Sequence, residues 1–409
     1  MKLFRDSHPT LDISDKPSEL LLRSIYIAFF LQLLVIVYGS LLGSSGPSLV
    51  HKYIFGLDFF DFYNASTDWM HGINPYIRVR FVTPPPSILV GLFLHWAGFG
   101  GGRYLFAVIN LILVLLSVKA IANWLRLSRK AGAYLMAIAL LDYPVMFLVE
   151  RGNIDGLVLS CLAFAVVTSR PWLRGGLISL SAGLKVYGIL LLVPFVWQRQ
   201  WKMAAGILLG LILLLLPFAH LVAPFGKTLL VRGTELKWTE NLSPSLIFLE
   251  VSKKMNFPKI YLWTIKAMYL VFWAGTLLLA LLKERENGTE NLVLPYLPWM
   301  VAFPMQVFPY TGVLLLPVLA WKMRQLDDRM AAQPNSEPLL KLPDKLFLAG
   351  FLLVGVQAWA MSQCFGWFVD SRLFFPALNS FGMLLILVGM AFQQRHYAAR
   401  KQASQITLP

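Results

Sequence analysis

Residues 204–221 read AAGILLGLILLLLPFAHL, a run of eighteen positions without one charged side chain. Residues 25–42, 261–282 and 373–392 form further stretches of this kind, with at most one charge each. A helix needs about 20 mostly apolar residues, within a range of about 17 to 25, to cross a bilayer. The sequence therefore predicts an all-α protein, a polytopic bundle of transmembrane helices.

The composition of the whole chain agrees with this prediction. The chain has 409 residues, of which 57% are hydrophobic and 14% charged, whereas soluble domains average about 45–50% apolar and about 25% charged residues. The formal net charge is +15, but Lys and Arg lie in short clusters between apolar stretches rather than along one basic face. Membrane topology explains this charge, and we expect no nucleic-acid partner.

The first part of the chain predicts one span followed by a large loop. The span is expected at residues 22–42, and residues 43–103 form a first outer loop with helix-like pieces at 58–72 and 84–99. The glycine-rich segment 98–102 is expected to close the second piece as a turn. If that piece lies on the membrane surface, the next two basic clusters fall in the cytoplasm, as the positive-inside rule favours.

The rest of the chain predicts about 11–13 membrane helices in total. Residues 173–197 are interrupted at Lys185, which predicts either a hairpin of two short helices or one ordinary span with Lys185 buried. A second large outer loop is expected at 224–259. Other spans are expected at 104–122, 132–149, 154–168, 203–223, 260–282, 293–308, 310–321, 346–361 and 373–392, giving one transmembrane domain at 22–392 with cytoplasmic tails at 1–21 and 393–409.

With this topology, unusual polar residues gather on the outer side of the membrane. They are Asp58, Asp61, Asp68, Glu150, Arg151, Asn153, Asp155, Lys185 and Asn241. Ionisable groups at a membrane boundary cost free energy unless they are paired or hydrated, so such a cluster indicates a functional site. The alternative is an interfacial network of salt bridges.

Asp58 is the strongest catalytic candidate in this cluster. Its neighbours in the segment GLDFF are apolar, a setting that suits a carboxylate to act as a general base. The alternative is a helix N-cap, with Asp61 as the capping-box acid three residues later. The two carboxylates have no third ligand in the loop, and Cys and His lack zinc-site spacing, so we expect no metal and no cofactor.

Four short motifs then resemble one family in their order and spacing. They are Asp58 with Phe62-Tyr63, Ala65, Gly72 and Pro75-Tyr76; Pro84-Pro85-Pro86; Arg151-Gly152-Asn153-Ile154-Asp155; and Lys185-Val186-Tyr187 before Pro194. This arrangement resembles glycosyltransferase family 87 of the GT-C superfamily, which includes actinobacterial mannosyltransferases. The resemblance implies a GT-C type bundle with surface helices in the first outer loop.

The resemblance also implies an activity and roles for the candidate residues. The expected enzyme is a hexosyltransferase of a bacterial inner membrane that moves a sugar, mannose by resemblance, from a polyprenyl-phosphate donor to a lipid or glycan acceptor at the extracytoplasmic face. Asp58 is then the general base, and the candidate substrate-binding residues are Asp61, Tyr63, Arg151, Asn153, Asp155, Lys185 and Asn241. Arg151 and Lys185 are candidates for the lipid phosphate, because cations stabilise phosphate charge.

The sequence leaves open part of the site and an alternative function. Residues 303–310 depart from the family's pattern of a late segment with a His or Asp, so a second acid or base and the identity of the sugar stay open. A flippase or transporter of lipid-linked sugars is the alternative function, and it predicts pseudo-symmetric halves with midplane charges.

Overall fold

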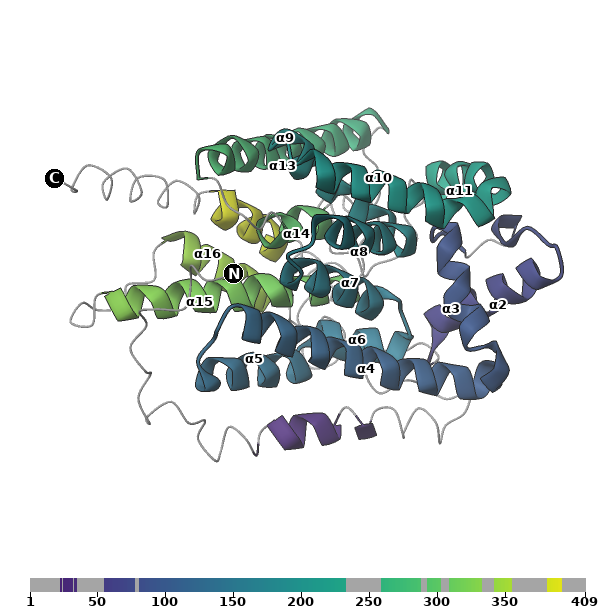
Figure 1. Ribbon diagram of the computed structural model, residues 1–409, viewed down its shortest axis with the longest axis horizontal. Helices are drawn as coiled ribbons and strands as arrows, with labels where there is room; N and C mark the ends of the chain where they lie inside the picture. The colour runs from purple at the N-terminus through teal and green to yellow at the C-terminus, as the bar shows by residue number, and fades with distance from the viewer. Residues whose placement is uncertain are drawn as a thin grey trace.

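The described part of the chain is built from helices alone. The computed structural model describes residues 23, 25–31, 33–34, 55–77, 81–232, 259–287, 293–302, 309–332, 342–354 and 381–391. All regular structure in these ranges is α-helical or 3-10 helical, which confirms the predicted all-α class. Figure 1 shows the longer helices lying side by side in one bundle.

The helices of the first half are α2 (Leu57–Met70), α3 (Ile88–Phe93), α4 (Gly98–Trp124), α5 (Arg129–Leu141), α6 (Tyr143–Arg151), α7 (Asp155–Val167), α8 (Pro171–Leu184), α9 (Leu192–Trp197), α10 (Trp201–Leu215) and α11 (Ala219–Arg232). The later helices are α13 (Lys259–Asn287), α14 (Val293–Val301), α15 (Leu316–Ala332) and α16 (Leu342–Val354). The 3-10 turns used below are η6 (Val186–Leu191) and η8 (Pro309–Leu315).

Two segments among the described residues are long and apolar enough to cross a membrane. They are His95–Trp124 and Trp201–Val231, and the bent pair Arg129–Leu141 with Tyr143–Arg151 makes a third if it is one span. Shorter apolar helices occur at Asp155–Val167, Val186–Trp197, Ala267–Leu282 and Phe381–Ala391. The predicted spans at 104–122 and 203–223 therefore correspond to helices of spanning length.

The prediction of a hairpin at residues 173–197 is confirmed in its geometry. Helix α8 ends at Leu184, and η6 packs back against it, so closely that a Cβ on Gly188 would lie 2.8 Å from the backbone nitrogen of Ala182. Helix α10 then runs parallel to α8, because Gly206 contacts Gly175 and Gly210 contacts Ser179 one turn later. A single straight span through Lys185 is therefore excluded.

The predicted span at 132–149 is divided by a bend of 49° between α5 and α6. Asp142 takes an extended backbone conformation at the break, and Pro144 stands in the first turn of α6. Proline has no N–H to continue the hydrogen bonds of the preceding helix, which explains why the chain changes direction here.

The first outer loop differs from its prediction in how its helices begin and end. The predicted piece at 84–99 is only a short helix, α3, between 3-10 turns. Gly98, with a φ of 64°, makes the expected turn, but the next glycines form the first turn of α4. Gly102 is accommodated there because it packs on Phe59, whose Cζ would lie 2.8 Å from a Cβ at this position.

Two later boundaries also differ from the sequence expectations. Helix α11 continues to Arg232, so the beginning of the predicted outer loop at 224–259 is helical. Helix α15 continues to Ala332, beyond the predicted span at 310–321, and Lys322 lies buried on this extension, with its Nζ 3.5 Å from Oδ1 of Asp344 on α16. The predicted tails at 1–21 and 393–409, and most of the first span, lie outside the described residues.

Candidate functional site

Asp58 lies in the first turn of α2 and faces the interior of the protein. The N-cap of this helix is Gly56, whose φ of 74° is left-handed, and no side chain caps the helix. The N-cap alternative for Asp58 is therefore wrong. Asp61 stands too far along the helix to be the capping-box acid. The side chain of Asp58 does not cap its own helix and instead contacts a segment that is distant in the sequence.

That segment is the turn between α6 and α7. Nη2 of Arg151 donates to Oδ1 of Asp58, and Nδ2 of Asn153 donates to Oδ2 at 2.6 Å. Arg151 and Asp58 form a buried ion pair, with 9% and 11% of their side chains exposed. Both carboxylate oxygens of Asp58 thus have a donor, and each oxygen keeps a second lone pair for another hydrogen bond.

Two glycines allow α2 and the end of α6 to approach so closely. Gly152 closes α6 in the left-handed region, with a φ of 62°, and a Cβ there would lie 3.0 Å from the Cβ of Phe59 and 3.6 Å from the Cα of Gly56. The backbone N–H of Gly56 donates to the carbonyl oxygen of Glu150 at 2.8 Å. Glycine fits both positions because a left-handed backbone disfavours other residues.

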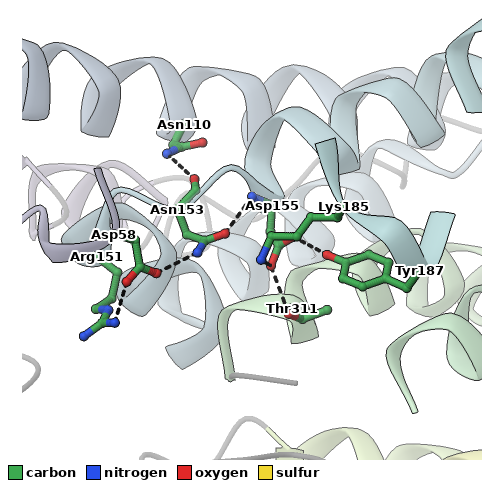
Figure 2. Close-up of polar contacts among 8 residues, drawn as sticks. All are labelled: Asp58, Asn110, Arg151, Asn153, Asp155, Lys185, Tyr187 and Thr311. Carbon is green, nitrogen blue, oxygen red and sulfur yellow. Dashed lines mark hydrogen bonds and ion pairs between the residues drawn. The ribbon is translucent and has the colours of Figure 1, made fainter. Parts of the chain in front are cut away.

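Asn153 connects this ion pair to a second polar cluster. Its Oδ1 accepts from the backbone N–H of Asp155 at 3.2 Å, and its carbonyl oxygen accepts from Nδ2 of Asn110 on α4 at 2.8 Å. Figure 2 shows Asn153 between Asp58 on one side and Asp155 on the other. One amide side chain therefore links the carboxylate of Asp58 to the backbone of Asp155.

Asp155 begins α7 and is fully buried, with 0% exposure. The hydroxyl of Tyr187 donates to its Oδ1, and Oγ1 of Thr311 donates to its Oδ2 at 2.9 Å. Nζ of Lys185 lies 3.9 Å from the same Oδ2, which is an ion-pair distance rather than a hydrogen bond. Three segments, α7, the start of η6 and η8, meet at this carboxylate (Figure 2).

The charges of the two clusters balance each other. Asp58 pairs with Arg151, and Asp155 pairs with Lys185, so these four groups carry no net charge. Asp155 also stands at the N-terminus of a helix, where a negative charge is favoured by the helix dipole. Such balance is required in a site that is largely shielded from water, because an unpaired buried charge is costly.

The structure brings together five of the predicted site residues, namely Asp58, Arg151, Asn153, Asp155 and Lys185. Tyr63 lies elsewhere on α2, where its ring stacks on His95 with centroids 4.8 Å apart. Asp61 lies on α2 between them in sequence and is partly exposed. Asn241 lies outside the described residues. The roles of Asp61, Tyr63 and Asn241 stay predictions.

Three residues of the network were not predicted as site residues. Tyr187 belongs to the motif Lys185-Val186-Tyr187, which supported the family resemblance, so the sequence contained an indication of its role in the site that was not used to predict it. Thr311 directly follows the departing segment 303–310, and nothing in its local sequence singles it out. Asn110 is a polar residue inside the apolar run at 104–122, which was the available signal for it.

The profile of glycosyltransferase family 87 matches residues 81–303, more than half of the chain. The chain belongs to glycosyltransferase family 87. The family match contains Arg151, Asn153, Asp155 and Lys185 and begins after Asp58.

Two individual relatives of this family 87 chain are mannosyltransferases by name. It is 26% identical over 160 residues to a polyprenol-phosphate-mannose-dependent alpha-(1-2)-phosphatidylinositol pentamannoside mannosyltransferase of Mycolicibacterium smegmatis, covering 38% of this chain and 39% of that protein. It is 27% identical over 146 residues to GPI mannosyltransferase 1 of Schizosaccharomyces pombe, covering 34% of this chain and 39% of that protein. The matched regions thus span about two fifths of either relative.

The described residues of the chain contain no group of three or more His, Cys, Asp or Glu side chains that could hold a metal ion. In the network itself, the two carboxylates are surrounded by nitrogen and hydroxyl donors.

Proposed function

We propose that this protein is a membrane glycosyltransferase that moves a hexose, mannose, from a polyprenyl-phosphate donor to a hydroxyl of a lipid or glycan acceptor. The observation that carries the proposal is the convergence of Asp58 on Arg151 and Asn153, which are 93 and 95 residues away in the sequence. Family membership and the mannose-dependent relative from Mycolicibacterium smegmatis support the class of donor.

Asp58 is the proposed general base. In the transfer, the acceptor oxygen forms a bond to the anomeric carbon of the sugar, and its proton passes to the carboxylate of Asp58. The bond between the anomeric carbon and the phosphate oxygen breaks, and the lipid phosphate leaves with the electron pair. A positioned base contributes about 10²–10⁴-fold to such a step.

Arg151 and Asn153 are proposed to orient this base. Each donates to a different oxygen of Asp58, so the plane of the carboxylate is fixed while one lone pair on each oxygen is left for the acceptor hydroxyl. A base that is held in one orientation before the acceptor binds needs no reorganisation during the reaction.

Lys185 is the proposed partner of the departing phosphate. It stands at the break between α8 and η6, and 15% of its side chain is exposed. An ammonium ion stabilises the negative charge that develops on a leaving phosphate. Asp155 is fully buried and already accepts from Tyr187 and Thr311, so we propose that it positions Lys185 rather than contacting the sugar.

The proposed location is a bacterial inner membrane, with the site on the extracytoplasmic face and the termini in the cytoplasm. Helices α2 and α3 gather at the end of α4 where that helix begins (Figure 1). Arg126, Arg129 and Lys130 lie at the other end of α4. Cytoplasmic loops carry an excess of Lys and Arg, and this supports placing α2 on the opposite side.

The experiment compares the wild type with Asp58→Asn, each purified and reconstituted into vesicles with labelled polyprenyl-phosphate mannose and a membrane lipid extract. Both labelled products and free polyprenyl phosphate are followed. The expected result is transfer by the wild type and a loss of at least about 100-fold in the variant. Asn is nearly the same size as Asp but offers only one acceptor oxygen to the donors of Arg151 and Asn153, so the melting temperature is measured to check that the variant is folded.

Three outcomes contradict the proposal in different ways. Equal transfer by both proteins removes Asp58 as the base. Transfer from another lipid-phosphate sugar but not from mannose corrects the donor. Movement of the labelled lipid across the bilayer without any transfer, unchanged in Asp58→Asn, supports the flippase instead.

A further inference from the structure

Asn110 is a fully buried amide in the middle of α4, with 0% exposure. It lies within His95–Trp124, one of the two segments that are long and apolar enough to cross a membrane. An amide in such a helix is costly unless it has hydrogen-bond partners. Packing alone therefore does not explain why an amide side chain occupies position 110.

The hydrogen bonding of Asn110 is one-sided. Its Nδ2 donates to the carbonyl oxygen of Asn153 at 2.8 Å, while its Oδ1 is buried without a partner in the described part of the chain. Turning the amide over would place two oxygens against each other, so the assignment of Nδ2 as the donor is fixed by its partner. The single bond that Asn110 makes is thus directed at the turn that carries Asn153.

Gly156 lets α4 come close enough for this bond. A Cβ on Gly156 would lie 2.3 Å from Oδ1 of Asn110 and 3.4 Å from its Cα. The first turn of α7 therefore packs directly on Asn110, and the α6–α7 turn is bound to α4 through the hydrogen bond from Asn110 to Asn153. On its other side, Asn153 donates to Oδ2 of Asp58.

We propose that Asn110 is a positioning residue for the glycosyl-transfer site, acting through Asn153 on the carboxylate of Asp58. This inference rests on the proposed function, since it assigns Asn110 to the base proposed there. Asn110 fixes the backbone of Asn153, and the side chain of Asn153 fixes the plane of the carboxylate. Loss of the bond lets the turn shift, and a shift of about 1 Å at a reacting group costs about 100-fold in rate.

A second polar contact between the same two helices provides a matched control. Ser117, two turns further along α4, lies 3.0 Å from Oγ of Ser160 on α7, and both hydroxyls are buried. Ser117 also donates to the carbonyl oxygen of Leu113 in its own helix. This contact links α4 to α7 as Asn110 does, but it has no hydrogen bond to the turn between α6 and α7 among the described residues.

The test compares Asn110→Leu with Ser117→Ala in the reconstituted transfer assay. Leu has the same branched shape as Asn and lacks both its donor and its unpartnered oxygen, and the melting temperature of the variant shows whether its larger methyl groups are accommodated against Gly156. The expected result is a kcat at least about 10-fold lower for Asn110→Leu, with the KM for the donor within about two-fold of wild type. Ser117→Ala is expected to stay within about two-fold for both constants. An unchanged kcat in Asn110→Leu, or equal losses in both variants, would overturn the inference.

A second measurement does not depend on turnover. Melting temperatures are measured in detergent for Asn110→Leu, Asp58→Asn and the double variant, and again with Ser117→Ala in place of Asn110→Leu. Residues in one hydrogen-bond network show effects that do not add, whereas independent sites add. We expect non-additive shifts only in the cycle with Asn110, and additive shifts in both cycles would contradict the connection.

A failure of the proposed base, Asp58, can be distinguished from a failure of the positioning role of Asn110. If Asp58→Asn keeps full transfer, the proposed base is wrong whatever Asn110 does. If Asp58→Asn is inactive while Asn110→Leu is as active as the wild type, Asp58 is retained as the base and the positioning role of Asn110 is rejected. If the wild type transfers no sugar, the thermal cycle still decides whether Asn110 is coupled to Asp58.

Discussion

Arg151 and Asp58 form a buried ion pair although 93 residues separate them in the sequence. The pair joins the end of α6 to the beginning of α2, so it ties the first outer loop to the helical bundle. The guanidinium also lies 5.7 Å from the centre of the Phe147 ring in its own helix, which orients it toward α2. An ion pair in this position influences both the stability and the chemistry of the site.

Replacing Arg151 by Met is expected to lower the free energy of unfolding by about 3–5 kcal/mol, because it leaves the buried carboxylate of Asp58 without its cation. Denaturant or thermal unfolding in detergent measures this change. The control is Asp328→Asn, which removes the exposed ion pair of Asp328 with Arg324 and is expected to cost less than about 1 kcal/mol. Similar effects of the two substitutions would show that the Arg151 pair is not shielded from water.

Gly152→Ala tests the close approach of α6 and α2. The substitution strains a left-handed backbone, at a cost of about 1–2 kcal/mol, and it also pushes against Phe59. Gly72 has nearly the same φ, 71°, but open space around its Cβ position, so Gly72→Ala reports the backbone strain alone. We expect Gly152→Ala to unfold at a lower temperature than Gly72→Ala and to lose most of its transfer activity.

Thr311→Val and Tyr187→Phe each remove one donor to Asp155. A hydrogen bond to a charged group contributes about 1.5–3 kcal/mol, so either variant is expected to lower the unfolding free energy by about that amount. Thr67→Val is the control, because Oγ1 of Thr67 donates to the carbonyl oxygen of Tyr63 in its own helix. Equal small losses in all three variants would show that Asp155 does not depend on these donors.

Lys185→Gln removes the proposed partner of the departing phosphate but keeps a polar side chain. Loss of one group that stabilises a developing negative charge costs about 100- to 1000-fold in kcat. The rate of release of free polyprenyl phosphate measures this effect. Lys119→Gln, at an exposed position on α4, is expected to leave the rate unchanged, and a normal rate in Lys185→Gln would exclude this residue from the chemical step.

Neighbouring glycines on α8 test the parallel packing of that helix against α10. A Cβ on Gly175 would lie 2.9 Å from backbone atoms of Gly206, whereas Gly176 has nothing within 4 Å. Gly175→Ala is expected to destabilise the protein by about 1–3 kcal/mol through overpacking. Gly176→Ala is expected to stabilise it by up to about 1 kcal/mol through helix propensity. The sign of the change in melting temperature distinguishes the two.

Sequence reasoning succeeded where a local pattern determines local structure. The uncharged stretch at 204–221 indicated a long apolar helix, and the interruption at Lys185 indicated a hairpin, both of which the structure contains. The candidates Asp58, Arg151 and Asn153 were found because charged and amide groups near apolar spans are costly. In the structure, Asp58 contacts both of the other two side chains.

The remaining features depend on partners far away in the sequence. Asp58 was given an N-cap alternative because Asp commonly caps helices, but its true contacts lie on the α6–α7 turn. Thr311 contacts Asp155 across 156 positions, and no pattern near either residue indicates this. The extension of α4 through a glycine-rich segment depends on the packing of Gly102 against Phe59, which overrides the weak helix propensity of glycine.

The wide separation of the site residues along the chain also bears on how the protein is made. Lys185 reaches the bilayer on the hairpin that follows α7, so the ammonium can neutralise Asp155 as soon as these two consecutive pieces have been inserted. Asp58 is synthesised much earlier and stays without its cation until Arg151 has left the ribosome. Thr311 completes the cluster when 311 of the 409 residues have been translated. A nascent chain therefore carries no complete site through most of its synthesis.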